Sequence, residues 1–157
     1  MTRVRAEIAG DLARRHFTPE EPGGDHFNCA ESTLLAVCES AGIKSEAVPA
    51  VASPFGGGMG RQGGACGAVT GAIMAIGLDR GRKGRADPRE PSYEPAAELH
   101  RRFKAEFGAT TCRELIGCDL NTPEGQEAFK VVQASGSCGN FVAMAARTAV
   151  ELLDKDR

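Results

Sequence analysis

Apolar residues recur every three or four positions over most of the chain, which is the spacing of one face of an α-helix. Val4, Ile8 and Leu12 form such a stripe over residues 3–16. Further helices are expected over residues 29–41, 66–78, 93–107, 112–116, 122–136 and 138–153. No segment alternates apolar and polar residues as a strand does. The pattern therefore predicts an all-α fold, a compact bundle of about six or seven helices with a Gly-rich loop.

The length of 157 residues is typical of one domain that buries its core without help from disulfides or metals. Proline and glycine in residues 18–25 separate an N-terminal helix and loop (1–26) from the rest, and residues 79–92 read as a solvated polar linker. We therefore expect a single domain over residues 1–157. The net charge of −2 and the aromatic content of 5% argue against nucleic-acid binding.

The N-terminal segment has no apolar run suited to a signal peptide, and no stretch reaches the length of a membrane helix. We expect a cytoplasmic protein that does not bind membranes. Thiols stay reduced in that compartment, so the six cysteines indicate metal or redox chemistry in preference to a disulfide framework.

The most unusual stretch is FGGGMGRQGGACGAVTGAIMAIGL, residues 55–78, in which a Gly-rich loop delivers Cys66 to the start of an apolar helix. Two other cysteines occupy similar places. Asn28 and Thr111 are each followed three residues later by glutamate, and this capping-box pattern puts Cys29 and Cys112 at first helical positions.

The last helix supplies a fourth such cysteine, because Ser137 is expected to cap a helix that begins at Cys138. A helix N-terminus carries roughly +0.5 charge and lowers the pKa of a cysteine from about 8.5 into the range of about 3.5–7.5. Four such ends would offset the charge of four thiolates. Our hypothesis is that the helices converge and that one metal centre is held by Cys29, Cys66, Cys112 and Cys138.

The type of centre is less well defined. The four cysteines are separated by 37, 46 and 26 residues, whereas structural zinc sites usually contain closely spaced pairs. An iron–sulfur cluster is therefore favoured, with zinc as the alternative. Backbone N–H groups in the glycine segment would approach the cofactor at Gly57, Gly58, Gly64 and Gly67. A metal-free thiol–disulfide protein with low-pKa cysteines is a further alternative.

Other candidates carry weaker signals. Cys38 lies in the apolar face of its helix and reads as packing, whereas Cys118 is open between a spare thiol, a redox partner of Cys112 and filler. His26 reads as a solvated loop residue, with metal ligation as the alternative. The glycine loop lacks the preceding strand of dinucleotide sites and the Lys-Ser/Thr pair of a phosphate loop. The basic residues between 80 and 89 read as solvated surface.

Cys29 in NCAEST, Cys66 in CGAVTG, Cys112 in TCRELIG and Cys138 in the last helix resemble the bacterial C-GCAxxG-C-C family of redox-active proteins. The resemblance covers residues 27–153. It implies a small cytosolic protein with a redox role and an iron–sulfur centre, found near oxidoreductase and transporter genes. An electron carrier or redox accessory protein, with oxidoreductases as partners, is then a better expectation than a stand-alone enzyme. The resemblance supplies no reaction, and a homodimer is left open.

Overall fold

The computed structural model describes residues 1–157, and every regular element in it is a helix. The elements are α1 (Thr2–Phe17), α2 (Cys29–Ala41), the 3-10 helix η1 (Ala50–Phe55), α3 (Gly56–Met59), α4 (Gly67–Arg80), α5 (Glu90–Phe107), α6 (Cys112–Ile116), α7 (Pro123–Ser135) and α8 (Ser137–Asp154). The all-α prediction is confirmed. The expected number of helices was slightly low, because the glycine loop itself contains the short α3. No helix is both long enough and apolar enough to cross a bilayer.

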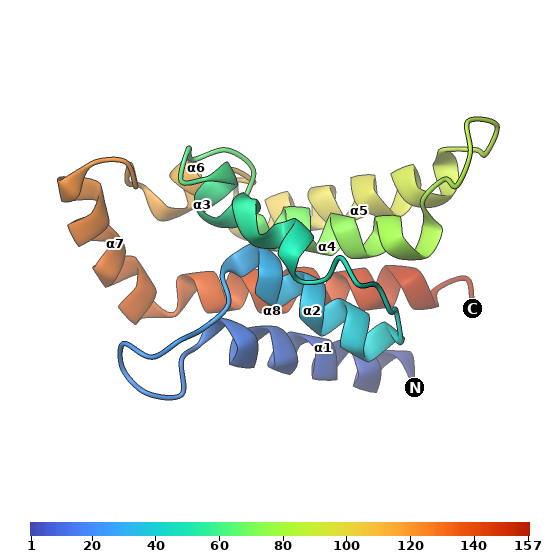
Figure 1. Ribbon diagram of the computed structural model, residues 1–157, viewed down its shortest axis with the longest axis horizontal. Coiled ribbons are helices and arrows are strands. Elements are labelled where there is room, and N and C mark those ends of the chain that lie inside the picture. Colours follow the sequence, from blue (N-terminus) through green and yellow to red (C-terminus); the bar gives the residue numbers. More distant parts are fainter.

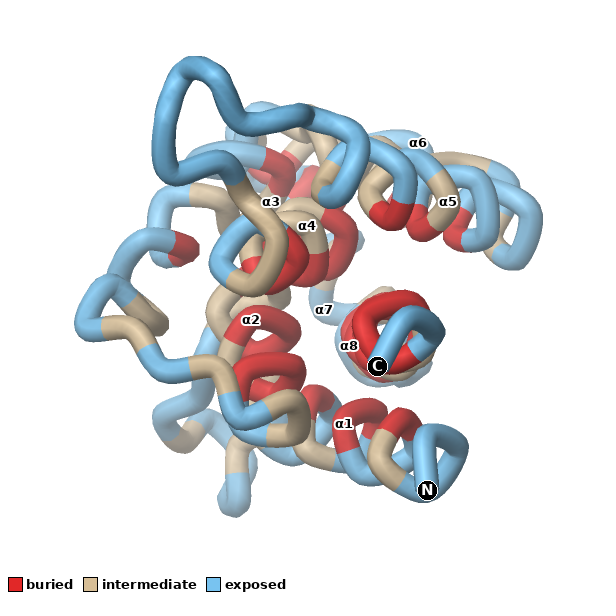
Figure 2. Tube along the Cα trace, turned by 90° about the vertical axis from the view of Figure 1, so that its right-hand side faces the viewer, coloured by how far each residue is buried: buried red, intermediate tan, exposed pale blue.

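Helix α8 is the centre of the fold, with α1, α2, α4 and α5 packed around it (Figures 1 and 2). Its sequence carries apolar or small residues on nearly every face, which is typical of a helix enclosed by others. Seven apolar residues of this helix are completely buried: Val142, Ala143, Ala145, Ala146, Ala149, Val150 and Leu153. The neighbouring helices therefore take their positions from α8.

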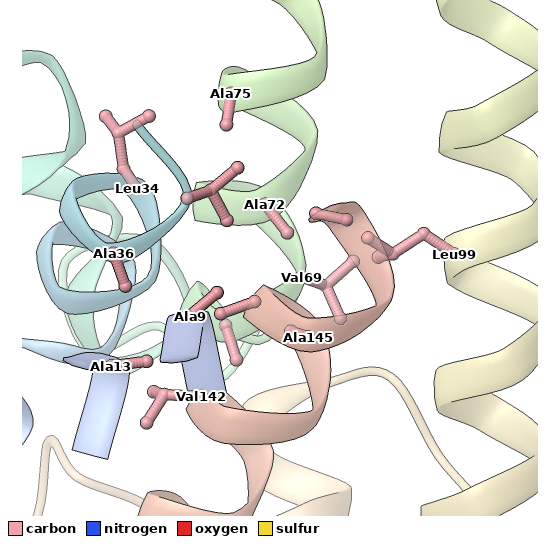
Figure 3. Close-up of a cluster of buried hydrophobic side chains, with 14 of the residues drawn as sticks. Ala9, Ala13, Leu34, Ala36, Val69, Ala72, Ala75, Leu99, Val142 and Ala145 are labelled. Atoms are coloured by element: carbon pink, nitrogen blue, oxygen red, sulfur yellow. The ribbon is translucent and has the colours of Figure 1, made fainter. Parts of the chain in front are cut away.

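The contact of α1 with α8 is made by small residues. Ala6, Ala9, Gly10 and Ala13 are the buried residues of α1, and Figure 3 shows Ala9 and Ala13 beside Val142 of α8. Of the predicted stripe Val4, Ile8 and Leu12, only Leu12 packs against the core, because Val4 and Ile8 are 63% and 48% exposed. Small side chains on the other face let the two helix backbones approach closely, and this tight packing decides the orientation of α1.

Helices α2 and α4 cross most closely near their N-termini. A methyl group built on Gly71 would fall inside the backbone of Ala30, and one built on Gly67 would overlap the sulfur of Cys29. Glycine is therefore needed at both positions for the backbones to approach. The crossing places the start of α2 directly against the start of α4.

The two ends of the molecule differ. Both chain termini lie at one end in Figure 1, whereas α3, α6 and α7 gather at the other, where α2, α4 and α8 begin. The polar connection is shorter than the predicted 79–92, because α4 extends to Arg80 and α5 already begins at Glu90. The N-termini of α2, α4 and α8 thus face the end that contains the glycine loop.

The α2–α4 crossing can be tested with two glycines of the same helix. We expect Gly71→Ala to lower the free energy of unfolding by about 1–3 kcal/mol, because the new methyl group meets backbone that cannot move aside. Gly77→Ala is the matched control, since nothing lies within 4 Å of its added methyl group, and it should raise stability by up to about 1 kcal/mol. Urea unfolding followed by circular dichroism measures both, and equal stability of the two variants would contradict the crossing.

Candidate metal centre

Four cysteines line one small apolar cavity at the glycine-loop end of the bundle. The cavity has a volume of about 50 Å³. Its lining consists of Phe17, Cys29, Gly57, Cys66, Gly67, Cys112, Leu115, Ile116, Leu120, Phe129, Cys138 and Phe141. The four helix-start cysteines singled out in the sequence are therefore brought together, although they come from segments far apart in the chain.

Cys29 is placed by the N-terminal cap of α2. The Asn28 side chain accepts a hydrogen bond from the Glu31 N–H at 2.9 Å, and the Asn28 N–H donates to Glu31 Oε1 at 3.0 Å. This is the predicted capping box, and Cys29 is the first helical residue. Asn28 Nδ2 also donates to the carbonyl of Ser53 at 3.0 Å, so the same cap ties α2 to the segment that leads into the glycine loop.

Cys66 and Cys112 are held next to one another by backbone pairing. The Cys66 N–H donates to the carbonyl of Thr110 at 2.8 Å, and the Cys112 N–H donates to the carbonyl of Gly64 at 2.7 Å. Between them Ala65 and Thr111 form an isolated antiparallel bridge. The pairing joins the end of the glycine loop to the start of α6, which fixes both cysteines at the cavity.

Cys138 enters the cavity from the start of α8. The expected cap is wrong, because α8 begins at Ser137, and its N-cap is Gly136, whose φ of 77° lies in the left-handed region. Cys138 is thus the second helical residue. Cys66 is the N-cap residue of α4, and Cys112 is the first residue of α6. All four cysteines lie within one residue of a helix start.

The glycine loop runs through a left-handed turn. Residues 57–61 all have positive φ, including the non-glycine residues Met59 (67°) and Arg61 (68°). Such a run is accessible mainly because glycine has no Cβ. Gly57 lines the cavity, whereas Gly58 and Gly64 lie behind it, where the Gly64 N–H donates to the Gly58 carbonyl at 2.9 Å. A cofactor role for these glycines stays a prediction.

The walls of the cavity are apolar and braced by aromatic rings. The ring of Phe141 lies 4.7 Å from that of Phe107 and 5.9 Å from that of Phe103, measured between ring centroids. The lining residues from α1, α6 and α7 are also apolar. Sequence reasoning missed these walls, because they come from the ends of several helices and share no local motif.

Burial raises the pKa of all four cysteine thiols in the metal-free protein. Burial is the largest cause for each of them, and the pKa reaches about 11 for Cys112 and about 12 for Cys138. Charge on the neighbouring cysteines raises the pKa of Cys66 and Cys112 further. The expectation of lowered pKa values is therefore wrong, because desolvation outweighs the helix ends.

Backbone N–H groups partly oppose this desolvation. Those of Gly57, Ala30 and Gly67 hydrogen-bond to the sulfur of Cys29 and lower its pKa, although burial still dominates. The N–H groups of Ala68 and Val69 act in the same way on Cys66. Donors that favour a negatively charged sulfur are thus already directed at the cavity, and two of the predicted glycines are among them.

The remaining candidates lie outside the cavity lining. Cys38 is buried in the hydrophobic core, as expected for packing. His26 is exposed and its ring packs edge-on against Phe17, 6.1 Å between centroids. Cys118 follows α6 and is half-buried. No three His, Cys, Asp or Glu side chains are grouped closely enough to hold a single metal ion.

The raised pKa values predict slow thiol chemistry in the metal-free protein. Because the pKa of Cys112 is about 11 and that of Cys138 about 12, their alkylation by iodoacetamide should rise about tenfold per pH unit from pH 7 to 10. When the chain is unfolded in urea, the alkylation rate of the same thiols should stop rising above about pH 9. These thiols have a lower pKa in the unfolded chain than in the folded protein. The free energy of unfolding should therefore fall as the pH rises above about 8.5. A plateau below pH 9 in the folded protein would contradict the burial argument.

Comparison with known proteins gives one match, to a protein family, over residues 27–152. No curated protein and no solved structure matches the chain. The family name spells a pattern of cysteines that Cys29, Cys66, Cys112 and Cys138 follow in order, although the chain reads Cys66-Gly67-Ala68 where the name writes Gly-Cys-Ala. Since the match covers most of the chain, this protein belongs to the family described as "Putative redox-active protein (C_GCAxxG_C_C)".

Proposed function

We propose that this protein binds an iron–sulfur cluster through Cys29, Cys66, Cys112 and Cys138 and passes electrons to and from oxidoreductase partners in the cytoplasm. The observation that carries the proposal is the convergence of four thiols, each from the start of a different helix, on one apolar cavity. The family's redox description agrees with such a role.

The cavity has the features expected of a cofactor cradle. Gly67 faces Cys29 so closely that any side chain would displace the sulfur, and Gly57 contributes both lining and an N–H donor. A volume of about 50 Å³ holds on the order of four water-sized bodies. This is room for a small group of atoms between the sulfurs, and the donor set is composed of thiols, which suit iron–sulfur clusters.

Charge balance also supports a bound cofactor. Desolvation makes the four lining thiols resist ionisation on their own, so they become ligands only if cationic metal ions replace their protons. The N–H donors around Cys29 and Cys66, together with the helix N-termini, would stabilise the residual negative charge.

Zinc fits this cavity less well than a cluster does. One zinc ion needs four sulfurs at about 2.3 Å from a single point, and the side chains are not grouped in that way. A cluster presents several metal atoms over a larger volume, so its ligands stand further apart. The long sequence separations between the cysteines point in the same direction.

The metal-free alternative, in which rapid thiol–disulfide exchange is the protein's main activity, requires low-pKa thiolates. The thiols of Cys112 and Cys138 instead have pKa values of about 11 and about 12, and a protonated thiol is a poor nucleophile. When bound, the cluster would supply one-electron chemistry. The protein's own contribution is to hold it with four sulfurs, direct N–H donors at them, and exclude water with apolar walls.

The proposal predicts that single ligand substitutions abolish a shared chromophore. Anaerobic reconstitution of the wild-type chain with iron and sulfide should give a coloured protein with stoichiometric iron and acid-labile sulfide. Cys29→Ser and Cys138→Ser should each reduce both contents to near zero, because a cluster with a missing thiolate ligand is lost from an apolar cavity.

Cys38→Ser is the matched control, since Cys38 is buried in the core away from the cavity lining, and it should keep the chromophore. Thermal unfolding of each metal-free variant separates ligand loss from instability. A colourless wild-type protein after reconstitution would refute the proposal, as would equal loss of iron in all three variants. Stoichiometric zinc without redox activity would instead favour the zinc alternative.

A further inference from the structure

A fifth thiol, Cys118, lies beside the four that line the cavity. It is half-buried and does not contribute to the cavity lining. It directly follows the glycine that closes α6, the helix that begins with Cys112. In agreement with this position, charge on Cys118 raises the pKa of both Cys112 and Cys138. The family pattern counts four cysteines, so Cys118 is an additional thiol at the same end of the molecule.

The end of α6 folds Cys118 back toward Cys112. Helix α6 has only five residues and is closed by Gly117, whose φ of 70° and ψ of 17° are left-handed. The Gly117 N–H donates to the carbonyl of Arg113 at 2.8 Å. When a helix ends at a left-handed glycine, the residue after the glycine commonly folds back onto the last turn of the helix. It then packs against the residues four and five positions before the glycine. Here the residue is Cys118, and these positions are Arg113 and Cys112.

An ion pair also joins the first turn of α6 to the segment that contains Cys118. Arg113 Nη2 lies 3.1 Å from Asp119 Oδ1, and each of these residues directly follows one of the two cysteines in the chain. The segment that contains Cys118 is therefore joined to the first turn of α6 by both a backbone hydrogen bond and a charged contact. Cys112 and Cys118 are the pair of thiols that this local structure favours.

We propose that Cys112 and Cys118 form a reversible disulfide when the metal-free protein meets hydrogen peroxide or another hydroperoxide. The disulfide removes Cys112 from the ligand set, so cluster binding is blocked until a dithiol reductant restores both thiols. This regulatory consequence rests on the proposed function, whereas the pairing itself does not require a metal.

With hydrogen peroxide the reaction balances as two thiols and one peroxide giving one disulfide and two water molecules; an organic hydroperoxide gives an alcohol in place of the first water. Cys118, which is outside the cavity lining, attacks the peroxide: a sulfur–oxygen bond forms, the oxygen–oxygen bond breaks, and one water leaves. The sulfur of Cys112 then attacks the sulfenic acid of Cys118, a slow step because burial keeps the Cys112 thiol mostly protonated. The sulfur–sulfur bond forms, and the oxygen leaves as the second water. Both thiol protons end in water, and the two electrons lost by the sulfurs reduce the peroxide.

Tryptic mapping identifies the disulfide without ambiguity. Trypsin places Cys112 on residues 105–113, Cys118 on residues 114–130 and Cys138 on residues 131–147. Metal-free protein treated with hydrogen peroxide should lose the mass of two hydrogen atoms, and on alkylation in denaturant it should take up two alkyl groups fewer than untreated protein. It should also yield a linked pair of the first two peptides, which dithiothreitol separates. Cys118→Ser should lose this link completely, and Cys38→Ser should retain it.

A link between Cys112 and Cys138, or sulfinic acid at Cys118 without any disulfide, would overturn the inference. The regulatory part is tested on the same samples: oxidised wild-type protein should take up little iron, and reduction or the Cys118→Ser substitution should restore uptake after peroxide. Full iron uptake by the linked protein would also overturn it. If reduced wild-type protein never binds iron, the proposed function fails, whereas the peptide map still decides the pairing.

Discussion

The close crossing of α2 and α4 is the constraint on which the rest of this structure depends. Gly67 and Gly71 leave no room for a side chain against Cys29 and Ala30, so the two helices meet at their first turns. That contact sets Cys29 beside Cys66, and the pairing of Gly64 with Cys112 then brings α6 to the same place. Because α8 is enclosed by the other helices, its start delivers Cys138 to the remaining side. The cavity is a consequence of backbone packing.

The packing that forms the cavity also determines its chemistry. Apolar walls and mutual proximity keep the thiols protonated, while N–H groups from Gly57 and Gly67 are already aimed at one sulfur. This combination disfavours a free thiolate and favours a state in which metal cations take the place of protons. Cys118 is half-buried, as are Cys29, Cys112 and Cys138, but it does not contribute to the cavity lining. The site thus contains four sulfurs that line the cavity and one that lies outside it.

Local signals predicted a large part of the fold and of the candidate site. Asn28 and Glu31 indicate the start of α2. Capping residues and apolar periodicity were enough to identify four cysteines at helix starts. The predictions that were wrong concern features that depend on tertiary packing. The spacing of Val4 and Ile8 correctly predicted a helix, but these residues do not face the core. Close contact with α8 requires small residues, so Ala9 and Gly10 face α8 instead. The pKa expectation failed for a related reason: a helix end is visible in the sequence, whereas burial is not. The pairing of Cys66 with Thr110 is equally non-local. For Cys118 a signal was available, since a cysteine directly after a helix-closing glycine lies where such caps fold back.

The central claim is that four converging thiols hold several metal atoms in one cavity. X-ray absorption at the iron edge of anaerobically reconstituted wild-type protein tests this most directly. The account predicts that sulfur alone surrounds each iron in its first shell and that a second iron lies nearby. Nitrogen or oxygen ligands, or isolated iron without an iron neighbour, would contradict it.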